Sequence, residues 1–432
     1  MSAFDRSDRF QVELPEILTE IASPRVPDYV DDLLAQTAAT PQRPRWTFLE
    51  RWLPMGVIAR RPLFFPTVPW RTIVTIALLI ALLAVAVFVA GSQTKVPPPF
   101  GPARNGALVF GEGDIYLRDG LTGSTTLVVG GPTNDFAATF TRDGRRLLFL
   151  RSTEGPAGSP NERLVVMAAN PDGSEAVAVT EPLVAPDWWD ITPDDSAVVV
   201  ATGDPKFGQY LKVASIRNPG PMRQIDVGDP RMTFSFPNLL GPTGAEIVFR
   251  GNTRTSAGRR FGLFAVHLDG SGLRPLTATD GLDNAYLFPQ PSPSGQYLTY
   301  TTWDTKVNMN RVHTLDLRTG ADRVVSDPAR NQGFATFSPD SQLIIFDTYR
   351  SDRNQITVAR VDGSGPQLPM GLNYPQVNDQ FISGVFSPDG KSVIVNDPGS
   401  KETRLVDAAT GGDGELLPWS AGNISGWQRL AP

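Results

Sequence analysis

The chain has 432 residues, 41% of them hydrophobic, which is enough for a large folded core, and its formal net charge is −6. The absence of cysteine excludes disulfides, thiol catalysis and thiolate metal sites. A mildly acidic chain is also a poor nucleic-acid binder, because counterion release requires a basic surface. We therefore expect no nucleic-acid partner, and no motif indicates a cofactor or a metal.

Residues 1–71 form an N-terminal segment with two halves of opposite charge. Residues 1–42 contain three basic and eight acidic side chains, whereas residues 43–71 contain six basic and one acidic. Residues 14–21 and 27–34 each begin with proline and acidic residues, which predicts two short amphipathic helices. Helices this short are unstable alone, so residues 1–50 are expected either to bind a cytoplasmic partner or to form a solvated tail.

Residues 42–55 interleave arginine with tryptophan, phenylalanine and leucine. This pattern favours a segment that lies on the membrane surface, with basic groups on anionic lipid and rings at the headgroup level. Docking of a protein is the alternative interpretation, because tryptophan and arginine are common interface anchors.

Thr72–Ala90 comprises nineteen residues without a charge, a proline or a glycine. At about 1.5 Å per residue this length matches the roughly 30 Å of hydrocarbon in a bilayer, so we expect a transmembrane helix in contact with lipid. Four arginines lie within about twenty residues before the span and only Lys95 and Arg104 after it, which places the N-terminus in the cytoplasm. The chain is expected to be a single-pass cell-membrane protein, with a proline-rich linker at 91–105 and residues 106–432 outside.

Residues 106–432 contain a repeat of about 50 residues. A tight turn followed by a hydrophobic strand recurs, and the fourth residue of each turn is at 143, 194, 243, 294, 340 and 389. A second turn follows within most repeats, for example at 170–173, 268–270 and 361–363. Four strands per repeat predict an all-β fold, a β-propeller.

The two ends of this domain complete each other. Residues 106–129 supply three strands of a blade, and residues 424–427 repeat the residues 382–385 that open the last full blade. We therefore predict seven blades closed by a C-terminal strand, which hides the sheet edges. Six blades are the alternative if the copy at 240–249 or the split copy is not a blade.

The turn Phe386-Ser-Pro-Asp-Gly390, the strand after it and the turn at 361–365 resemble the WD40-like repeats of TolB-type β-propellers. The resemblance covers roughly 106–432. It implies a protein-binding platform, a sensor domain or a gating domain on a peptidase.

An enzyme is not expected. The chain contains no Gly-x-Ser-x-Gly, and no residues are left after the ring for a hydrolase domain. Its two histidines, His267 and His313, are each placed at the end of a predicted strand, and general acid–base catalysis needs a convergent partner that the spacing does not supply.

The candidate contact residues lie in the longer loops, opposite the short turns, because variable loops usually carry function. Arginine and tryptophan are typical interface anchors. The candidates are Arg250, Arg254, Arg259 and Arg260 in one loop, Tyr349, Arg350 and Arg353 in a second, and Trp303 with Trp188 of the pair Trp188-Trp189. Packing of the tryptophans between blades and simple solvation of the arginines is the alternative.

Two main functions are expected from this layout. The first is a membrane-anchored extracytoplasmic propeller that binds a protein or an anionic polymer of the bacterial cell envelope. The second is a transmembrane signalling regulator that resembles an anti-sigma factor, with the propeller as sensor and residues 1–50 bound to a cytoplasmic protein. The usual His and Cys zinc motif of that family is absent from the sequence. An enzyme on a propeller scaffold is the third choice.

Overall fold

The computed structural model describes two compact units, Met1–Ser92 and Gln93–Pro432. The described residues are 70, 74–82, 100–156, 159, 161–184, 186, 188–204, 208–229, 232–255, 258–278, 287–349, 353–375, 383–397, 401–420 and 424–431.

In the first unit, residues 74–82 are helical, and their apolar side chains are exposed. None of the helices within the described ranges is both long enough and apolar enough to cross a membrane. The rest of the predicted span Thr72–Ala90 lies outside the described residues, as do the two predicted helices and the interfacial segment.

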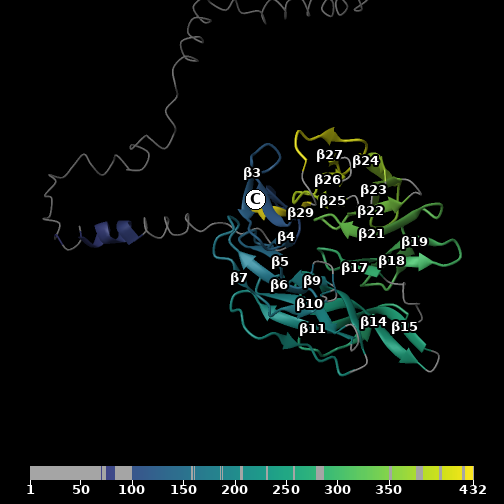
Figure 1. Cartoon of the computed structure of the whole chain (residues 1–432). Helices are drawn as coiled ribbons and strands as arrows, with labels where there is room; N and C mark the ends of the chain where they lie inside the picture. The colour runs from purple at the N-terminus through teal and green to yellow at the C-terminus, as the bar shows by residue number, and fades with distance from the viewer. Residues whose placement is uncertain are drawn as a thin grey trace, which may run out of the picture. The chain divides into compact units, whose positions relative to one another are not determined.

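The second unit is a ring of seven antiparallel sheets, each with a path of four strands (Figure 1). The first blade contains β29 (Ile424–Leu430), β1 (Arg104–Glu112), β2 (Asp114–Arg118) and β3 (Thr125–Val129). The second contains β4 (Asp135–Phe140), β5 (Leu147–Glu154), β6 (Arg163–Ala169) and β7 (Val177–Ala178), with β8 (Leu183–Val184) also paired to β6. The third contains β9 (Trp188–Ile191), β10 (Ala197–Asp204), β11 (Gly208–Ser215) and β12 (Arg223–Gln224).

The remaining four blades follow in chain order. The fourth contains β13 (Phe234–Leu240), β14 (Glu246–Thr255), β15 (Gly258–His267) and β16 (Arg274–Pro275). The fifth contains β17 (Leu287–Pro291), β18 (Tyr297–Asp304), β19 (Met309–Asp316) and β20 (Asp322–Val324). The sixth contains β21 (Asn331–Phe337), β22 (Leu343–Tyr349), β23 (Arg353–Arg360) and β24 (Leu368–Pro375). The seventh contains β25 (Ser383–Phe386), β26 (Ser392–Asp397), β27 (Glu402–Asp407) and β28 (Glu415–Leu416).

The prediction of seven blades is confirmed, and the six-blade alternative is wrong, because both doubtful copies form four-stranded sheets. The first-named strand of each blade is the inner one, and inner strands of most neighbouring blades contact one another around the axis. We call the end of the ring where the inner strands begin the hairpin face, and the opposite end the turn face.

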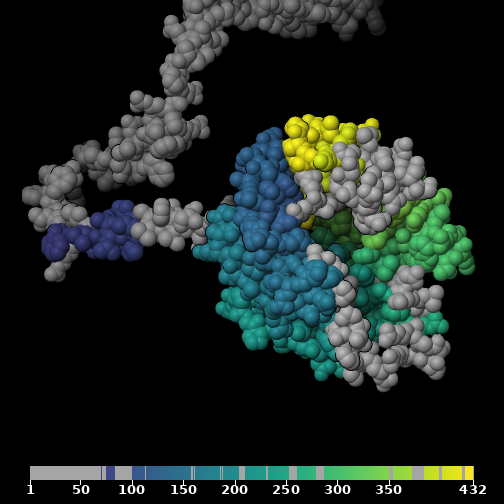
Figure 2. All heavy atoms as spheres, viewed as in Figure 1, coloured from purple at the N-terminus to yellow at the C-terminus, as the bar shows by residue number. Residues whose placement is uncertain are grey.

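The C-terminal strand closes the ring as predicted. Strand β29 pairs antiparallel with β1, with Trp427 opposite Leu108. The indole Nε1 of Trp427 donates a buried hydrogen bond to the Gly106 carbonyl at 3.0 Å, across 321 residues of sequence. In the space-filling view, the blue residues of the first blade lie directly against the yellow C-terminal residues (Figure 2).

The recurring turn is stabilised by its own side chains. The Ser387 hydroxyl donates to Asp389 Oδ1 at 2.6 Å and accepts the Ser392 N–H at 3.0 Å. Asp389 also accepts the Lys391 N–H at 3.1 Å, and Gly390 has a φ of 74°, which a residue without Cβ adopts easily. The turns at 141–146 and 338–343 use the same bonds. This local chemistry explains why the repeat is visible in the sequence.

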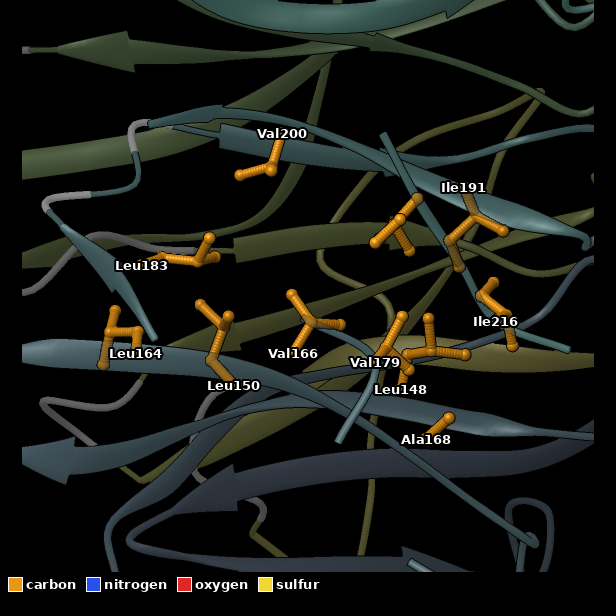
Figure 3. Close-up of a cluster of buried hydrophobic side chains, with 12 residues drawn as sticks. Leu148, Leu150, Leu164, Val166, Ala168, Val179, Leu183, Ile191, Val200 and Ile216 are labelled. Atoms are coloured by element: carbon orange, nitrogen blue, oxygen red, sulfur yellow. The ribbon is translucent and has the colours of Figure 1, made fainter. Parts of the chain in front are cut away.

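The core lies between neighbouring blades. Figure 3 shows aliphatic side chains of the second and third blades interleaved between the two sheets. Leu148 and Val166 from one sheet and Val198 and Val200 from the next are all fully buried. Because each sheet is covered on both faces, its strands are continuous apolar runs, as in the buried stretch 147–150.

Candidate functional site

Four of the predicted contact residues lie on a single hairpin. Arg250 and Arg254 are on β14, and Arg259 and Arg260 are on β15. Arg254 is directly opposite Arg259 in the register, and Arg260 is opposite Thr253. We call these four arginines the basic hairpin. It belongs to the longest pair of strands in the described part of the chain, and it projects from the ring at the hairpin face (Figure 1).

The register of the basic hairpin places two arginines at directly opposite positions, Arg254 and Arg259. Like charges at such positions of an antiparallel pair are in general destabilising. The guanidinium of Arg250 lies 4.4 Å from the centroid of the Phe261 ring, a cation–π contact that fixes its side chain. The hairpin therefore gathers four arginines within residues 250–260.

The other predicted residues occupy the same end of neighbouring blades. Trp303 is near the end of β18, Tyr349 ends β22 and Arg353 begins β23. Arg350 lies outside the described residues. Trp188 begins β9 with 39% of its surface exposed, whereas Trp189 packs against the core between the second and third blades. The interblade packing alternative therefore holds for Trp189 and not for Trp188.

Three phenylalanines form a wall on the inner strands that the sequence reasoning missed. Phe236, Phe288 and Phe334 come from β13, β17 and β21, and their ring centroids are 4.4 and 4.3 Å apart in succession. Each lies at a register shift of its strand and has a positive φ, of 52°, 52° and 59° respectively. Phe334 is also 37% exposed. A bulky residue in this conformation is a genuine outlier.

The neighbouring blade braces each bulge of this wall. The amide Nδ2 of buried Asn238 donates to the carbonyls of Phe236 at 3.2 Å and of Pro289, in the next blade, at 2.8 Å. The N–H of Phe334 donates to the Thr301 hydroxyl of the preceding blade at 3.0 Å. Strained backbone persists where its surroundings determine it, and it is frequent at ligand-binding sites.

Tyr349 joins this wall to a buried carboxyl. Its ring meets Phe334 edge-on with centroids 6.1 Å apart, and its hydroxyl donates to Asp347 at 2.9 Å. Burial raises the pKa of Asp347 to about 7. Burial and the neighbouring Asp347 also raise the pKa of Tyr349 above its ordinary value. Asp347 is therefore a group that can change its charge near neutral pH.

Cavities of 210, 320 and 500 Å³ lie around the axis at the turn face. All three are lined by Pro293, and the smallest is lined by residues of four inner strands together with Phe100, which precedes β1. Arg142, Asp190 and Arg429 are its charged residues. No sequence pattern indicated this cluster, because its members are far apart in the chain.

His313 is not at the end of a strand as predicted but within β19, whereas His267 does end β15. His313 Nε2 lies 3.0 Å from the Thr302 hydroxyl, and Nδ1 lies 3.3 Å from Asp322 Oδ1. Tyr300 stacks on the imidazole at 4.8 Å and donates its hydroxyl to Asp322 Oδ2 at 2.7 Å. The order hydroxyl, imidazole, carboxylate is the one that an activated nucleophile uses. The partners of His313 are thus Thr302 and Asp322, from the adjacent strands β18 and β20. The spacing of the histidines in the sequence did not indicate them.

No protein-family profile matches the chain, and no curated protein matches it by sequence. Among solved structures, the chain is similar to the periplasmic gluconolactonase of Pseudomonas aeruginosa, with 16% identity over 75% of this chain and 99% of that one and a TM-score of 0.52. A prolyl endopeptidase is similar at 14% identity and a TM-score of 0.52, over 76% of this chain and 51% of the other, so the chain spans about half of that enzyme. TolB of Acinetobacter baumannii matches at 15% identity over 74% of this chain and 82% of that one, with a TM-score of 0.45.

These comparisons correct one expectation. The absence of a hydrolase motif led to the prediction that the protein is not an enzyme, but the fold is shared with a lactonase and an endopeptidase. The prediction that the protein is not an enzyme is therefore wrong, because enzymes are found among the proteins that share this fold. At these identities the similarity shows the fold alone, and what it shows is a β-propeller.

Proposed function

We propose that the protein is a membrane-anchored binding module of the bacterial cell envelope and that its basic hairpin contacts an anionic partner, either an acidic protein surface or an anionic polymer. In this proposal Thr72–Ala90 spans the bilayer, the N-terminus is cytoplasmic and the propeller is outside. One observation carries the choice of contact surface: Arg254 lies opposite Arg259 on a hairpin that also holds Arg250 and Arg260. Like charges at opposite positions of a sheet are in general destabilising, and a bound anion offsets this cost.

Binding to poly-L-glutamate tests the contact surface. The double charge reversal R254E/R259E should weaken binding by the full-length chain about tenfold or more, and added salt should weaken wild-type binding. The matched control is R318E/R323E, which changes the net charge equally at exposed positions of the turn face. Equal losses of binding in the two variants would show that net charge alone determines the affinity. This result would reject the basic hairpin as the contact surface.

The topology is tested separately because the chain has no cysteine of its own. A T319C variant carries one thiol at an exposed position of the turn face. A membrane-impermeant maleimide should label it in intact cells, whereas S7C should react only after permeabilisation. Labelling of S7C in intact cells, or protection of T319C, would reject the proposed orientation.

A transmembrane regulator is the second candidate. It is supported by the position of Phe100, which lies in the axial cavities and follows directly on the segment that leads from the span. A regulator requires residues 1–50 to hold a cytoplasmic protein. Affinity capture with the full-length chain and with a chain lacking residues 1–50 should then differ in one retained protein, and identical captures would reject this candidate.

A further inference from the structure

The axial cavities at the turn face hold an aromatic ring of the chain itself. Phe100 lines the cavities of 210 and 500 Å³, and its ring lies 4.5 Å below the guanidinium of Arg142. Pro242, Pro293 and Pro339 from the turns of three blades line the larger cavity with it. These walls are apolar and rigid, which suits a planar ring.

Arg142 has a buried donor that makes no hydrogen bond within the described residues. Its Nη2 donates to Asp190 Oδ1 at 3.3 Å and to the Ile191 carbonyl at 3.1 Å. Its Nε is buried and has no hydrogen-bond partner among the described residues. A buried donor without a partner is costly, and a native structure usually explains it by a ligand or an ion.

Asp190 forms an ion pair with Arg142 through Nη2, at 3.3 Å, and its other hydrogen bonds go to backbone groups and not to Nε. Asp190 accepts the N–H of Ile191 at 2.7 Å and the N–H of Leu239 at 2.9 Å. Arg429 adds a second guanidinium to the lining of the 210 Å³ cavity, and burial together with Arg142 lowers its pKa. The cavity therefore offers a position for an aromatic ring beneath the Arg142 guanidinium. It also offers the Nε donor of the same guanidinium.

We propose that this cavity is a binding site for a small aromatic anion, an aromatic ring with a carboxylate on a short arm, and that Phe100 fills the ring position when no ligand is bound. The ligand's ring replaces Phe100 under Arg142, and its carboxylate accepts the hydrogen bond that Arg142 Nε does not make in this structure. The site lies at the turn face and is thus distinct from the basic hairpin.

The chain around Phe100 is suited to release. Gly101 has a φ of 86°, and glycine can adopt both signs of φ, so rotation at this residue can move Phe100. Ala103 is buried, and its N–H donates to the Pro388 carbonyl at 2.8 Å. Movement of Phe100 therefore leaves β1 in place.

Calorimetric titration of the full-length chain with phenylacetate tests the proposal, with uncharged phenylacetamide as the matched ligand. The F100A variant should bind phenylacetate about tenfold more tightly than the wild type, because the competing ring is gone. It should prefer phenylacetate over phenylacetamide; R142K, which keeps the charge but loses the guanidinium geometry, should reduce that preference, and R142Q, which removes the charge, should abolish it. The control is F261A, which removes the ring of the equivalent Arg250 contact and should not tighten binding.

Two results would overturn the proposal. Unchanged or weaker binding in F100A would show that Phe100 is a fixed wall rather than an occupant. Equal affinity of F100A for the two ligands would reject the anionic class. Thermal unfolding of each variant distinguishes loss of the site from loss of the fold, and a variant with R142Q serves if R142K does not fold.

Discussion

Asp195 holds the neighbouring blade through Arg142: its Oδ1 accepts the Arg142 backbone N–H at 2.8 Å, and its Oδ2 accepts the next N–H at 2.9 Å. Asp195 is the last residue of its own turn and has a φ of 55°, at a position that is glycine in four other copies. Ser341 repeats the arrangement, since its hydroxyl accepts the Ser294 N–H at 3.0 Å. The last position of the turn is thus not glycine in the two copies in which its side chain, that of Asp195 or Ser341, links two blades.

Two substitutions at Asp195 separate the link from the backbone conformation. D195G and D195A both remove the carboxylate, so both should be less stable than the wild type. D195A should be the less stable of the two by about 1 kcal/mol, because alanine is strained at positive φ. Urea unfolding followed by tryptophan fluorescence measures both. Equal stability of the two variants would contradict the role given to φ.

Asp347 should make stability depend on pH near neutrality. Its pKa is raised from 3.8 to about 7, so the folded state retains the proton at pH values where the unfolded state has lost it. The stability that the proton linkage contributes is complete below pH 4 and is lost as the pH rises through 7. Relative to D347N, the wild type should lose on the order of 2 kcal/mol between pH 4.5 and pH 8. Parallel stability curves for the two proteins would show that this carboxyl does not titrate as described.

Trp427 should be the most sensitive position in the closing strand. W427A removes a buried side chain and should cost about 3–5 kcal/mol. W427F retains most of the volume but loses the bond to the Gly106 carbonyl, for an expected cost of about 1 kcal/mol. Trp188, which is 39% exposed, provides the control, and W188A should cost less than about 1 kcal/mol. Chemical denaturation measures the stability of each variant. A loss of stability in W427A no larger than that in W188A would contradict the role of Trp427 in closing the ring.

Substitution of Arg259 should change stability and binding in opposite directions. R259E places an acidic residue opposite Arg254 in the register, and opposite charges at such positions should stabilise the ring by about 0.2–1 kcal/mol. The same change should weaken binding to poly-L-glutamate. Thermal unfolding and titration on one preparation test the two effects together. If R259E is less stable than the wild type and binds poly-L-glutamate equally well, the proposal that the basic hairpin contacts an anionic partner is wrong.

The fold could be predicted because its signals are local. The turn at 387–392 forms bonds only among its own residues, and each strand is a short apolar run beside it. The closing strand could be predicted because 424–427 repeats an earlier segment. The arginines of the basic hairpin were found for the same reason, since they are neighbours in the sequence.

The remaining features depend on contacts between strands or between blades that are not local in the sequence. Phe236 has a positive φ because Asn238 holds its carbonyl together with that of Pro289 in the next blade. His313 meets Thr302 and Asp322 only when three strands are in register. A periodicity of about 50 residues predicts a blade, but it does not predict which side chain of one blade reaches the next.

The pairing of β29 with β1 also sets the order of events when the protein is made. A nascent chain presents the edge of β1 from the moment its first blade emerges, and the strand that covers it is made only after the strands of the six other blades. Until then β1 has an open edge that other chains can pair with. Deletion of the seven residues of β29 would recreate this edge in the folded protein.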